Sequence, residues 1–439
     1  MKKITCTGCS LLCDDIIIEE GKEIKELIGA CLKGQDRLDQ VHSENRILKP
    51  QIRKGEELKK TNWNEALERT LELINKAQKP LLYGFSTISC EAQVKAIKLA
   101  KKIDGFIDSN STICQGRTFN AAKETGLTIS TLTEVINKSD IIVLWGFNAV
   151  ESIPRLLNKV LFSRGKFRMT GREIKTLIVI DPIKTASFNV MGPRDIAIRI
   201  NPDEDIKLIR KLTEICCKDS QIPDDGIAGI DKDDLERLLT NLTNSENIAI
   251  FVGQGLLKPQ NGSDPLKELI QLVDVINSRN KKGRASLLAA GGHYNMIGFD
   301  HMALASEGKN HSLQFKNNEL IDNEENIISK IKKEDFDLSI VVGTDPIAHL
   351  PFELSKKLAA KPIILIDYSK SATYFVSDVV LPTAITGIES GGTAFRLDNV
   401  PIPLIKFLDP PEEVYSDEEL LDKILITLDN GKEETGKWN

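Results

Sequence analysis

The chain has 439 residues, of which 41% are hydrophobic and 28% are charged, and its formal net charge is −6. At about 150 residues per domain this length predicts roughly three domains, and the composition excludes a disordered or fibrous protein. The negative balance argues against a general nucleic-acid binder, whose affinity comes from neutralising phosphates. No apolar run approaches the roughly 18 residues of a membrane span, and Lys2 and Lys3 do not lead into the apolar stretch of a signal peptide, so we expect a cytoplasmic protein.

The first predicted element is a cysteine-rich segment. The motif Cys6-x2-Cys9-x3-Cys13-x17-Cys31 places three thiolates on one short loop and a fourth on a later turn, the arrangement that closes around a cubane iron–sulfur cluster. Four thiolates also suit a structural zinc ion, which is the alternative. Lys33 lies two residues after the fourth cysteine, so it suits a position between the cluster and a neighbouring anionic cofactor, with a solvated surface lysine as the other interpretation. Clustered thiols without a signal sequence favour a reducing compartment.

An α/β alternation follows the cysteine-rich segment. Trp63-Asn64-Glu65-Ala66-Leu67 opens a helical pattern that runs to about Asn75. Beyond it, short runs rich in β-branched residues alternate with amphipathic helical stretches, which indicates parallel sheets with ligands at the carboxyl ends of the strands. The predicted strands are Pro80 to Gly84, Asp140 to Gly146, Thr176 to Asp181, Asn247 to Gly253, Leu338 to Gly343 and Pro362 to Asp367.

Two of these strand pairs resemble each other. Residues 142–148 match residues 340–345, and the segments beginning at Asp181 and Asp367 share the pattern Asp-x-x-Lys-[Ser/Thr]-Ala-[Ser/Thr]. We predict two related lobes that bind two nucleotide-like ligands, in which each Asp accepts from a ribose or a guanine edge while Lys, Ser/Thr and helix N-termini hold phosphates. The alternative is that the Ile-Asp dipeptide at the end of both second strands, Ile180-Asp181 and Ile366-Asp367, is merely common at strand ends. The candidate cofactor-binding residues are Lys33, Gly146, Asn148, Asp181, Lys184, Gly343, Asp345, Asp367 and Lys370.

Together these motifs resemble the molybdopterin-dinucleotide oxidoreductase superfamily. The likeness rests on the cysteine motif with Lys33-Gly34, on residues 46–50 (Arg-Ile-Leu-Lys-Pro), on Trp63-Asn64-Glu65-Ala66 and on the paired lobes. Within the superfamily the chain is most similar to the B subunits of archaeal formylmethanofuran dehydrogenases, through Gly292-His293-Tyr294-Asn295 and residues 387–396. The resemblance implies reduction of CO2 to formate, the first step of CO2 reduction in methanogenesis, or its reverse. The cofactors implied are tungsten or molybdenum held by two molybdopterin guanine dinucleotides, and a [4Fe-4S] cluster.

The resemblance also implies an architecture and partners. We expect a multi-domain α/β protein of the molybdopterin oxidoreductase-like fold, with a small N-terminal iron–sulfur domain and two Rossmann-like parallel-sheet lobes. Because the chain ends soon after Val400-Pro401-Ile402, the pterin-capping barrel is expected from a small separate subunit. An amidohydrolase subunit, which condenses formate with methanofuran, and polyferredoxin subunits are the other implied partners. The expected boundaries are 1–60 with 384–439 for the iron–sulfur domain, 61–110 with 290–383 for the first lobe, and 111–289 for the second.

Cys114 stands where the family places the thiolate that binds the metal. A soft thiolate suits tungsten or molybdenum held by dithiolenes, and Gly116, two positions on, permits the close approach of a bulky cofactor. A buried free cysteine is the alternative. The other cysteines outside the amino-terminal motif, Cys90, Cys216 and Cys217, are interpreted in that way. The candidate metal ligands are therefore Cys6, Cys9, Cys13, Cys31 and Cys114.

Two positions depart from the family pattern. Gln115 replaces a histidine that follows the metal-binding cysteine, and Gly291 replaces an arginine that precedes Gly-His-Tyr-Asn. Both family residues suit a small anionic substrate, because Arg holds a carboxylate and His donates a hydrogen bond or relays a proton. The candidate catalytic residues are Cys114, Gln115 and His293, with Arg117, Arg284 and His293 as candidate substitutes for the missing groups.

Two other functions remain open at this point. The first is a scaffold or electron-transfer subunit of a related formyltransferase/hydrolase complex that has lost the metal, which Gln115 and Gly291 favour and Cys114 opposes. The second is a formate dehydrogenase-like oxidoreductase that acts on free formate or another small substrate.

Overall fold

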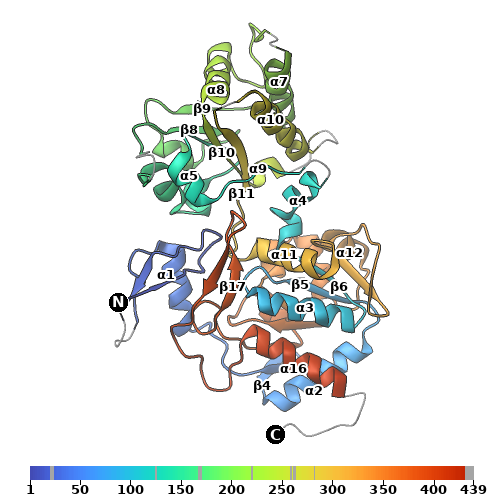
Figure 1. Cartoon of the computed structure of the whole chain (residues 1–439). Coiled ribbons are helices and arrows are strands. Elements are labelled where there is room, and N and C mark those ends of the chain that lie inside the picture. Colours follow the sequence, from blue (N-terminus) through green and yellow to red (C-terminus); the bar gives the residue numbers. More distant parts are fainter. Residues whose placement is uncertain are drawn as a thin grey trace. The chain divides into compact units, whose positions relative to one another are not determined.

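The computed structural model divides into two compact units (Figure 1). Unit 1 comprises Met1–Ile113, His293–Arg396 and Pro401–Asn439, and unit 2 comprises Cys114–Gly292 and Leu397–Val400. The structure describes residues 1–19, 24–123, 126–166, 171–218, 221–257, 260, 264–280 and 282–430. None of the helices described in these ranges is long and apolar enough to cross a membrane.

Unit 2 is built on a five-stranded sheet in the order β11-β10-β7-β8-β9, and every strand pair in it is parallel. The run Ile141–Trp145 of β7 is buried at every position, as expected of a strand covered on both faces. The strands are β7 (Ile141–Trp145), β8 (Thr176–Ile180), β9 (Ile196–Ile198), β10 (Asn247–Val252) and β11 (Arg284–Ala289). The helices are α4 (Gly116–Ala122), α5 (Leu132–Lys138), α6 (Ala149–Ser152), α7 (Asp205–Lys218), α8 (Lys232–Asn244), α9 (Gln254–Leu257) and α10 (Pro265–Arg279), with a π turn at Asn158–Phe162 and a 3-10 turn at Ala186–Val190.

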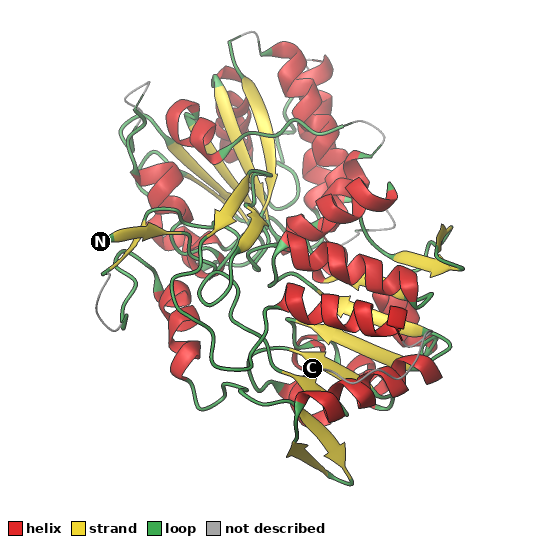
Figure 2. Ribbon diagram, turned by 60° about the horizontal axis from the view of Figure 1, so that its bottom comes forward, coloured by secondary structure: helices red, strands yellow, loops and turns green. Residues whose placement is uncertain are grey.

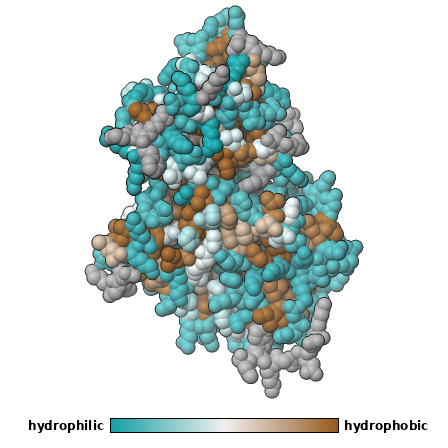
Figure 3. Space-filling view, viewed as in Figure 1, coloured by the Kyte–Doolittle hydropathy of each residue, from teal (hydrophilic) through white to brown (hydrophobic). Residues whose placement is uncertain are grey.

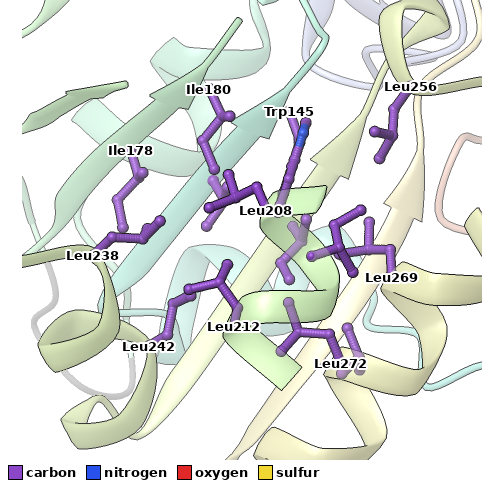
Figure 4. Close-up of a cluster of buried hydrophobic side chains, with 14 of the residues drawn as sticks. Trp145, Ile178, Ile180, Leu208, Leu212, Leu238, Leu242, Leu256, Leu269 and Leu272 are labelled. Carbon is purple, nitrogen blue, oxygen red and sulfur yellow. The ribbon is translucent and has the colours of Figure 1, made fainter. Parts of the chain in front are cut away.

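One large apolar core holds this unit together. Side chains on β7 and β8, including Trp145 and Ile178, meet leucines of four helices, including Leu208 on α7 and Leu238 on α8 (Figure 4). The indole Nε1 of Trp145 donates to Asp205 Oδ1 at 2.8 Å, so its polar atom is also satisfied inside the core. The core therefore fixes the strands whose carboxyl ends carry the candidate binding residues.

Unit 1 contains a nine-stranded mixed sheet in the order β13-β12-β6-β5-β14-β15-β16-β3-β4. Its central strands β6, β5, β14, β15 and β16 pair in parallel. Its strands are β3 (Gln51–Lys54), β4 (Glu57–Lys60), β5 (Pro80–Gly84), β6 (Phe106–Ser109), β12 (Leu313–Lys316), β13 (Glu319–Ile321), β14 (Leu338–Val342), β15 (Ile363–Ile366) and β16 (Val379–Leu381). The helices are α1 (Leu32–Asp39), α2 (Trp63–Lys76), α3 (Cys90–Lys102), α11 (Met296–Glu307), α12 (Ile327–Lys333), α13 (Pro346–His349), α14 (Phe352–Ala359), α15 (Ala372–Val376) and α16 (Asp417–Asn430), with 3-10 turns at Gln40–His42 and Asn110–Ile113.

Helices cover both faces of this sheet (Figure 2). Along β14, Ile340 and Val342 belong to one apolar cluster and Val341 to the cluster on the other face, which is the alternation expected of a strand. The exposed surface in one view is mostly hydrophilic, with scattered hydrophobic patches (Figure 3). The predicted strands and the helix beginning at Trp63 are confirmed, and Asn62 starts that helix by accepting from the Glu65 N–H at 2.9 Å.

The loop that carries Cys6, Cys9 and Cys13 joins the two strands of one small hairpin of unit 1, and Leu12 in that loop packs against a second hairpin. These hairpins are β1 (Lys2–Ile4) with β2 (Ile16–Ile18), and β17 (Gly392–Phe395) with β18 (Pro401–Leu404). The expected boundary at residue 60 falls inside the large sheet, because β3 and β4 pair along its edge next to β16. Helix α16 likewise packs its apolar side chains into the core under α3. The division of unit 1 into an iron–sulfur domain and a lobe therefore stays a prediction.

A buried ion pair joins the amino-terminal segment to the carboxyl-terminal part of unit 1. Arg46 Nη2 lies 2.6 Å from Glu389 Oε2, and the two side chains are only 3% and 1% exposed. Arg46 Nη1 also donates to the carbonyls of Tyr368 and Thr383 at 3.1 and 2.8 Å. Both residues lie in segments that carry the family resemblance. Part of that resemblance therefore reflects this structural ion pair, which we call the Arg46–Glu389 clamp.

Removing one partner of this clamp is expected to destabilise the chain strongly. Arg46→Ala should lower the free energy of unfolding by about 3–5 kcal/mol, because Glu389 is left as an unpaired buried charge. Urea denaturation measures the loss, with Glu57→Ala as a control whose carboxylate is exposed and 3.8 Å from Lys59. An Arg46→Ala cost no larger than that of the control would contradict the clamp.

Candidate functional site

Each sheet ends in a glycine turn of the same geometry. Gly146, after β7, donates its N–H to the carbonyl of Ile180 at 2.9 Å, and Gly343, after β14, donates to Ile366 at 3.0 Å. Both glycines have φ +56°, a left-handed conformation that favours glycine, and a Cβ on Gly146 would lie 2.8 Å from the Leu256 backbone nitrogen. The similarity seen in the sequence therefore corresponds to equivalent backbone turns in the two units.

The acidic strand ends are equivalent as well. The N–H of Asp181 donates to the carbonyl of Ile198, the last residue of β9, at 3.2 Å. The N–H of Asp367 donates to the carbonyl of Leu381, the last residue of β16, at 3.3 Å. Each carboxylate accepts from the backbone N–H two residues on, Ile183 at 2.9 Å and Ser369 at 3.4 Å. Burial raises the pKa of Asp367 to about 7 and also raises the pKa of Asp181. Both carboxyls are thus oriented acceptors in places that disfavour charge.

A side-chain hydrogen bond between the glycine turn and the segment after the strand-end Asp also recurs in both units. Ser187 Oγ donates to Asn148 Oδ1 at 3.2 Å, and Thr373 Oγ1 donates to Asp345 Oδ1 at 2.6 Å. The four residues occupy matching positions, two after each glycine and six after each strand-end Asp. This shared hydrogen bond extends the likeness beyond the Ile-Asp dipeptide. It therefore argues against the alternative that the dipeptide recurs only because it is common at strand ends.

The two lysines of the repeated pattern have exposed side chains. Lys184 and Lys370 both follow their strand-end Asp by three residues. The backbone N–H of Lys370 donates to the Asn45 carbonyl at 2.8 Å, and its Nζ lies 3.3 Å from the carbonyl of Glu44. Their positions beside the two turns suit contact with anionic groups, although their role as phosphate ligands stays a prediction.

Three of the four amino-terminal cysteines lie on one loop. The N–H of Cys6 donates to the Cys13 carbonyl at 2.9 Å and closes the loop, and Cys6, Cys9 and Cys13 are buried while Cys31 is half-buried just before α1. Burial, with smaller contributions from the other three thiols, raises the pKa of Cys9 to about 12. In the described part of the chain, no three His, Cys, Asp or Glu side chains form a group that could hold a metal ion as they stand.

Two glycines allow α1 to approach this loop. A Cβ on Gly34 would lie 2.8 Å from Cys6 Sγ, and a Cβ on Gly8 would lie 2.8 Å from the carbonyl oxygen of Lys33. The loop and the first turn of α1 can therefore meet only because neither glycine has a side chain. The side chain of Lys33 is exposed on that first turn.

Cys114 is the first residue of unit 2 and lies two positions before the start of α4. Its side chain is 4% exposed, and Gln254 Nε2 on α9 lies 3.2 Å from its Sγ. The candidate substitutes on the same unit lie elsewhere. Arg117 donates to the Leu257 carbonyl, and Arg284 pairs with Glu134 at 2.8 Å from the first residue of β11. Arg284 is thus at the amino end of its strand, away from the edge where ligands of parallel sheets bind.

His293 lies in unit 1, where its Nδ1 is 2.6 Å from Ser86 Oγ. Burial is the main cause that lowers the pKa of His293 to about 4, and electrostatic interactions with His349, Arg37 and Lys33 contribute in the same direction. At neutral pH the imidazole is therefore uncharged. The other three cysteines match their interpretation in part, since Cys90 and Cys216 are buried but Cys217 is exposed.

Comparison with known proteins identifies the family. The molybdopterin oxidoreductase family model matches residues 46–423. The chain belongs to this family. It is 31% identical to the B subunit of the tungsten-containing formylmethanofuran dehydrogenase 2 of Methanocaldococcus jannaschii, over 97% of this chain and 98% of that relative. Its identity to the protein of the same name from Methanococcus maripaludis is 29%, over 98% and 99%.

A solved structure agrees with the fold of this molybdopterin oxidoreductase. The formyltransferase/hydrolase complex from Methylorubrum extorquens, solved with methylofuran, contains a chain that matches 88% of this chain and 100% of its own length, with a TM-score of 0.69 at 16% identity. This likeness shows the fold. The family recognised from the motifs is confirmed, as is the α/β class with parallel strands.

The two departures from the family pattern are linked in this molybdopterin oxidoreductase. Gln115 is 1% exposed, and neither its Oε1 nor its Nε2 has a hydrogen-bond partner among the described residues. A Cβ on Gly291 would lie 1.9 Å from Gln115 Oε1, so the glutamine side chain occupies the space that a side chain at 291 needs. In the sequence these are two separate substitutions. In the structure the glutamine side chain at 115 requires a glycine at 291.

Sequence reasoning missed several polar residues at these sites. Arg37 on α1 is buried, its guanidinium lies 4.7 Å from the ring centre of Tyr368 and 5.6 Å from that of Tyr294, and its Nη1 donates to the Tyr368 hydroxyl. Ser86 and Gln254 were missed as well. Each is a single polar residue outside any motif, so the sequence carries no signal that separates them from ordinary surface residues.

Proposed function

We propose that this chain is the catalytic subunit of a formylmethanofuran dehydrogenase-like complex, in which CO2, two electrons and one proton form formate, or the reverse. The observation that carries the proposal is the similarity over nearly the whole length to the B subunit of a formylmethanofuran dehydrogenase. The matched turns in the two units and the amino-terminal cysteine motif support it. When bound, a tungsten or molybdenum bis-pterin centre supplies the two-electron redox chemistry.

The chain's own residues would hold two guanine dinucleotides at the two turns. Asp181 and Asp367 present oriented acceptors for guanine or ribose donors, and Gly146 and Gly343 let the backbone approach closely. Lys184 and Lys370 would neutralise phosphates, with Asn148 and Asp345 as further polar contacts. The equivalence of the turns supports binding of the same chemical group at both.

The cysteine motif supports the proposal of a cubane cluster. Cys6, Cys9, Cys13 and Cys31 would supply four thiolates, and the missing side chain of Gly34 lets the first turn of α1, which follows Cys31, lie close to Cys6. Cys114 would provide the thiolate ligand of the tungsten or molybdenum, with Gln254 donating to its sulfur. Lys33 would stand between cluster and pterin.

We propose that further subunits complete the complex. A small pterin-capping subunit, an amidohydrolase subunit and polyferredoxin subunits are the partners that we propose. The relative is named as one subunit of its enzyme, and the structural neighbour belongs to a complex of several chains, so both support assembly with other chains.

A metal-free scaffold subunit is the second candidate. The neutral pair Gln115 and Gly291 favours it, because the buried glutamine fills space where the family pattern places a cationic side chain. The retained Cys114 favours the catalytic function.

Restoring the family histidine separates these two functions. In the anaerobically purified complex, Gln115→His is expected to raise the rate of CO2 reduction about tenfold or more, because a positioned acid–base group contributes about 10²–10⁴-fold. Formate production with a low-potential dye measures the rate, and the exposed Gln78→His is the matched control. No reduction of CO2 by wild type or variant would favour the scaffold. Gly291→Arg is suitable only together with the change at Gln115, because of the 1.9 Å contact.

A further inference from the structure

A chain of hydrogen bonds connects His293 with the glycine turn of unit 1. His293 Nδ1 lies 2.6 Å from Ser86 Oγ, which donates to Asn110 Oδ1 at 2.9 Å. Asn110 Nδ2 donates to Thr344 Oγ1 at 3.0 Å and to the Tyr83 hydroxyl at 3.4 Å. Ser86, Asn110 and Tyr83 are 0%, 4% and 1% exposed, so water does not compete for these groups.

The single hydroxyl hydrogen of Ser86 determines the direction of the chain. Since Ser86 donates it to Asn110 Oδ1, its oxygen must accept from His293, which requires a hydrogen on Nδ1. The Asn110 amide uses both of its hydrogens on Thr344 and Tyr83. The Tyr83 hydroxyl then keeps its own hydrogen for His349 Nε2, at 3.2 Å.

We propose that Ser86 and Asn110 are positioning residues that hold His293 in the Nδ1–H tautomer, so that its Nε2 presents a hydrogen-bond acceptor to an N–H or O–H donor. This inference rests on the proposed function, in which His293 is a candidate catalytic residue. The lowered pKa of His293, caused first by burial, agrees with a neutral ring. His349, Arg37 and Lys33 are the charged or titratable groups that act on it.

The consequence is that His293 does not replace the arginine absent at position 291. A neutral ring whose remaining nitrogen carries a lone pair repels a carboxylate, whereas it accepts from the ring N–H or amino groups of a pterin or from water. Asn110 also connects the imidazole to Thr344, which lies between Gly343 and Asp345 in the candidate cofactor turn. A ligand at that turn therefore acts on the same hydrogen-bond chain.

Nitrogen NMR of the full chain labelled at histidine tests the tautomer without metal, pterin or turnover. At pH 7.5 the His293 signals, assigned by their loss in His293→Gln, are expected to show a protonated Nδ1 and an unprotonated Nε2. Ser86→Ala should convert most of the population to the Nε2–H tautomer, and Ser86→Thr should restore the wild-type pattern. Ser130→Ala, a buried serine of unit 2, is the matched control and should change nothing.

The outcomes separate this inference from the proposed function. A wild-type chain whose His293 carries its hydrogen on Nε2 would overturn the inference, even if Ser86→Ala does not fold. An unchanged tautomer in folded Ser86→Ala would overturn it too. Absence of CO2 reduction leaves these NMR results unaffected and contradicts only the proposed function.

Discussion

Cys114→Ala is expected to abolish CO2 reduction by the complex while its cluster iron stays bound. A thiolate that binds tungsten or molybdenum has no substitute in alanine, and Cys114 is separate from the four amino-terminal cysteines. As packing alone, loss of the sulfur costs about 1 kcal/mol, by analogy with small core truncations. Formate production and iron content, measured on the same preparation, give the two readouts.

Cys216→Ala is the matched control for this loss. Cys216 is 3% exposed in the core of unit 2, so its replacement removes a buried sulfur of similar burial without touching the site. Equal activity in the two variants would assign Cys114 to packing. A selective loss in Cys114→Ala, with unchanged thermal stability, would support its role as a metal ligand.

Cys9→Ser is expected to remove most of the iron from the chain. Cys9 lies in the loop closed by the Cys6 to Cys13 hydrogen bond, and a serine hydroxyl is a poor replacement for a cluster thiolate. The chain produced on its own and reconstituted without oxygen should lose its visible charge-transfer absorption and its bound iron. The exposed Cys217→Ser is the control and should retain both. Stoichiometric zinc in place of iron in the wild-type chain would contradict the cluster.

The sequence predicts the strands well because their signal is local. The run Ile141–Trp145 is continuously apolar and ends at Gly146, and Leu338–Val342 ends at Gly343 in the same way, as required of buried parallel strands with a sharp turn. The repeated Asp-x-x-Lys pattern also predicts equivalent turns, because each residue of the pattern has a local backbone role. Motif likeness was sufficient to recognise the molybdopterin oxidoreductase family.

Other features depend on contacts between distant parts of the chain. Ser86 and His293 are 207 positions apart in the sequence, and Arg46 and Glu389 are 343 positions apart. No local sequence pattern therefore predicts either contact. The fit of Gln115 against Gly291 likewise requires coordinates. The pairing of β3 (Gln51–Lys54) with β16 also joins segments more than 300 positions apart, which no local pattern in the sequence predicts.

The decisive measurement is the tungsten and molybdenum content of the complex, purified without oxygen together with its native partners. We expect stoichiometric tungsten or molybdenum per copy of this chain, lost in Cys114→Ala, and guanine nucleotide released when the protein is denatured. A complex that carries cluster iron but neither metal nor guanine nucleotide would contradict the catalytic function, and the scaffold function would take its place.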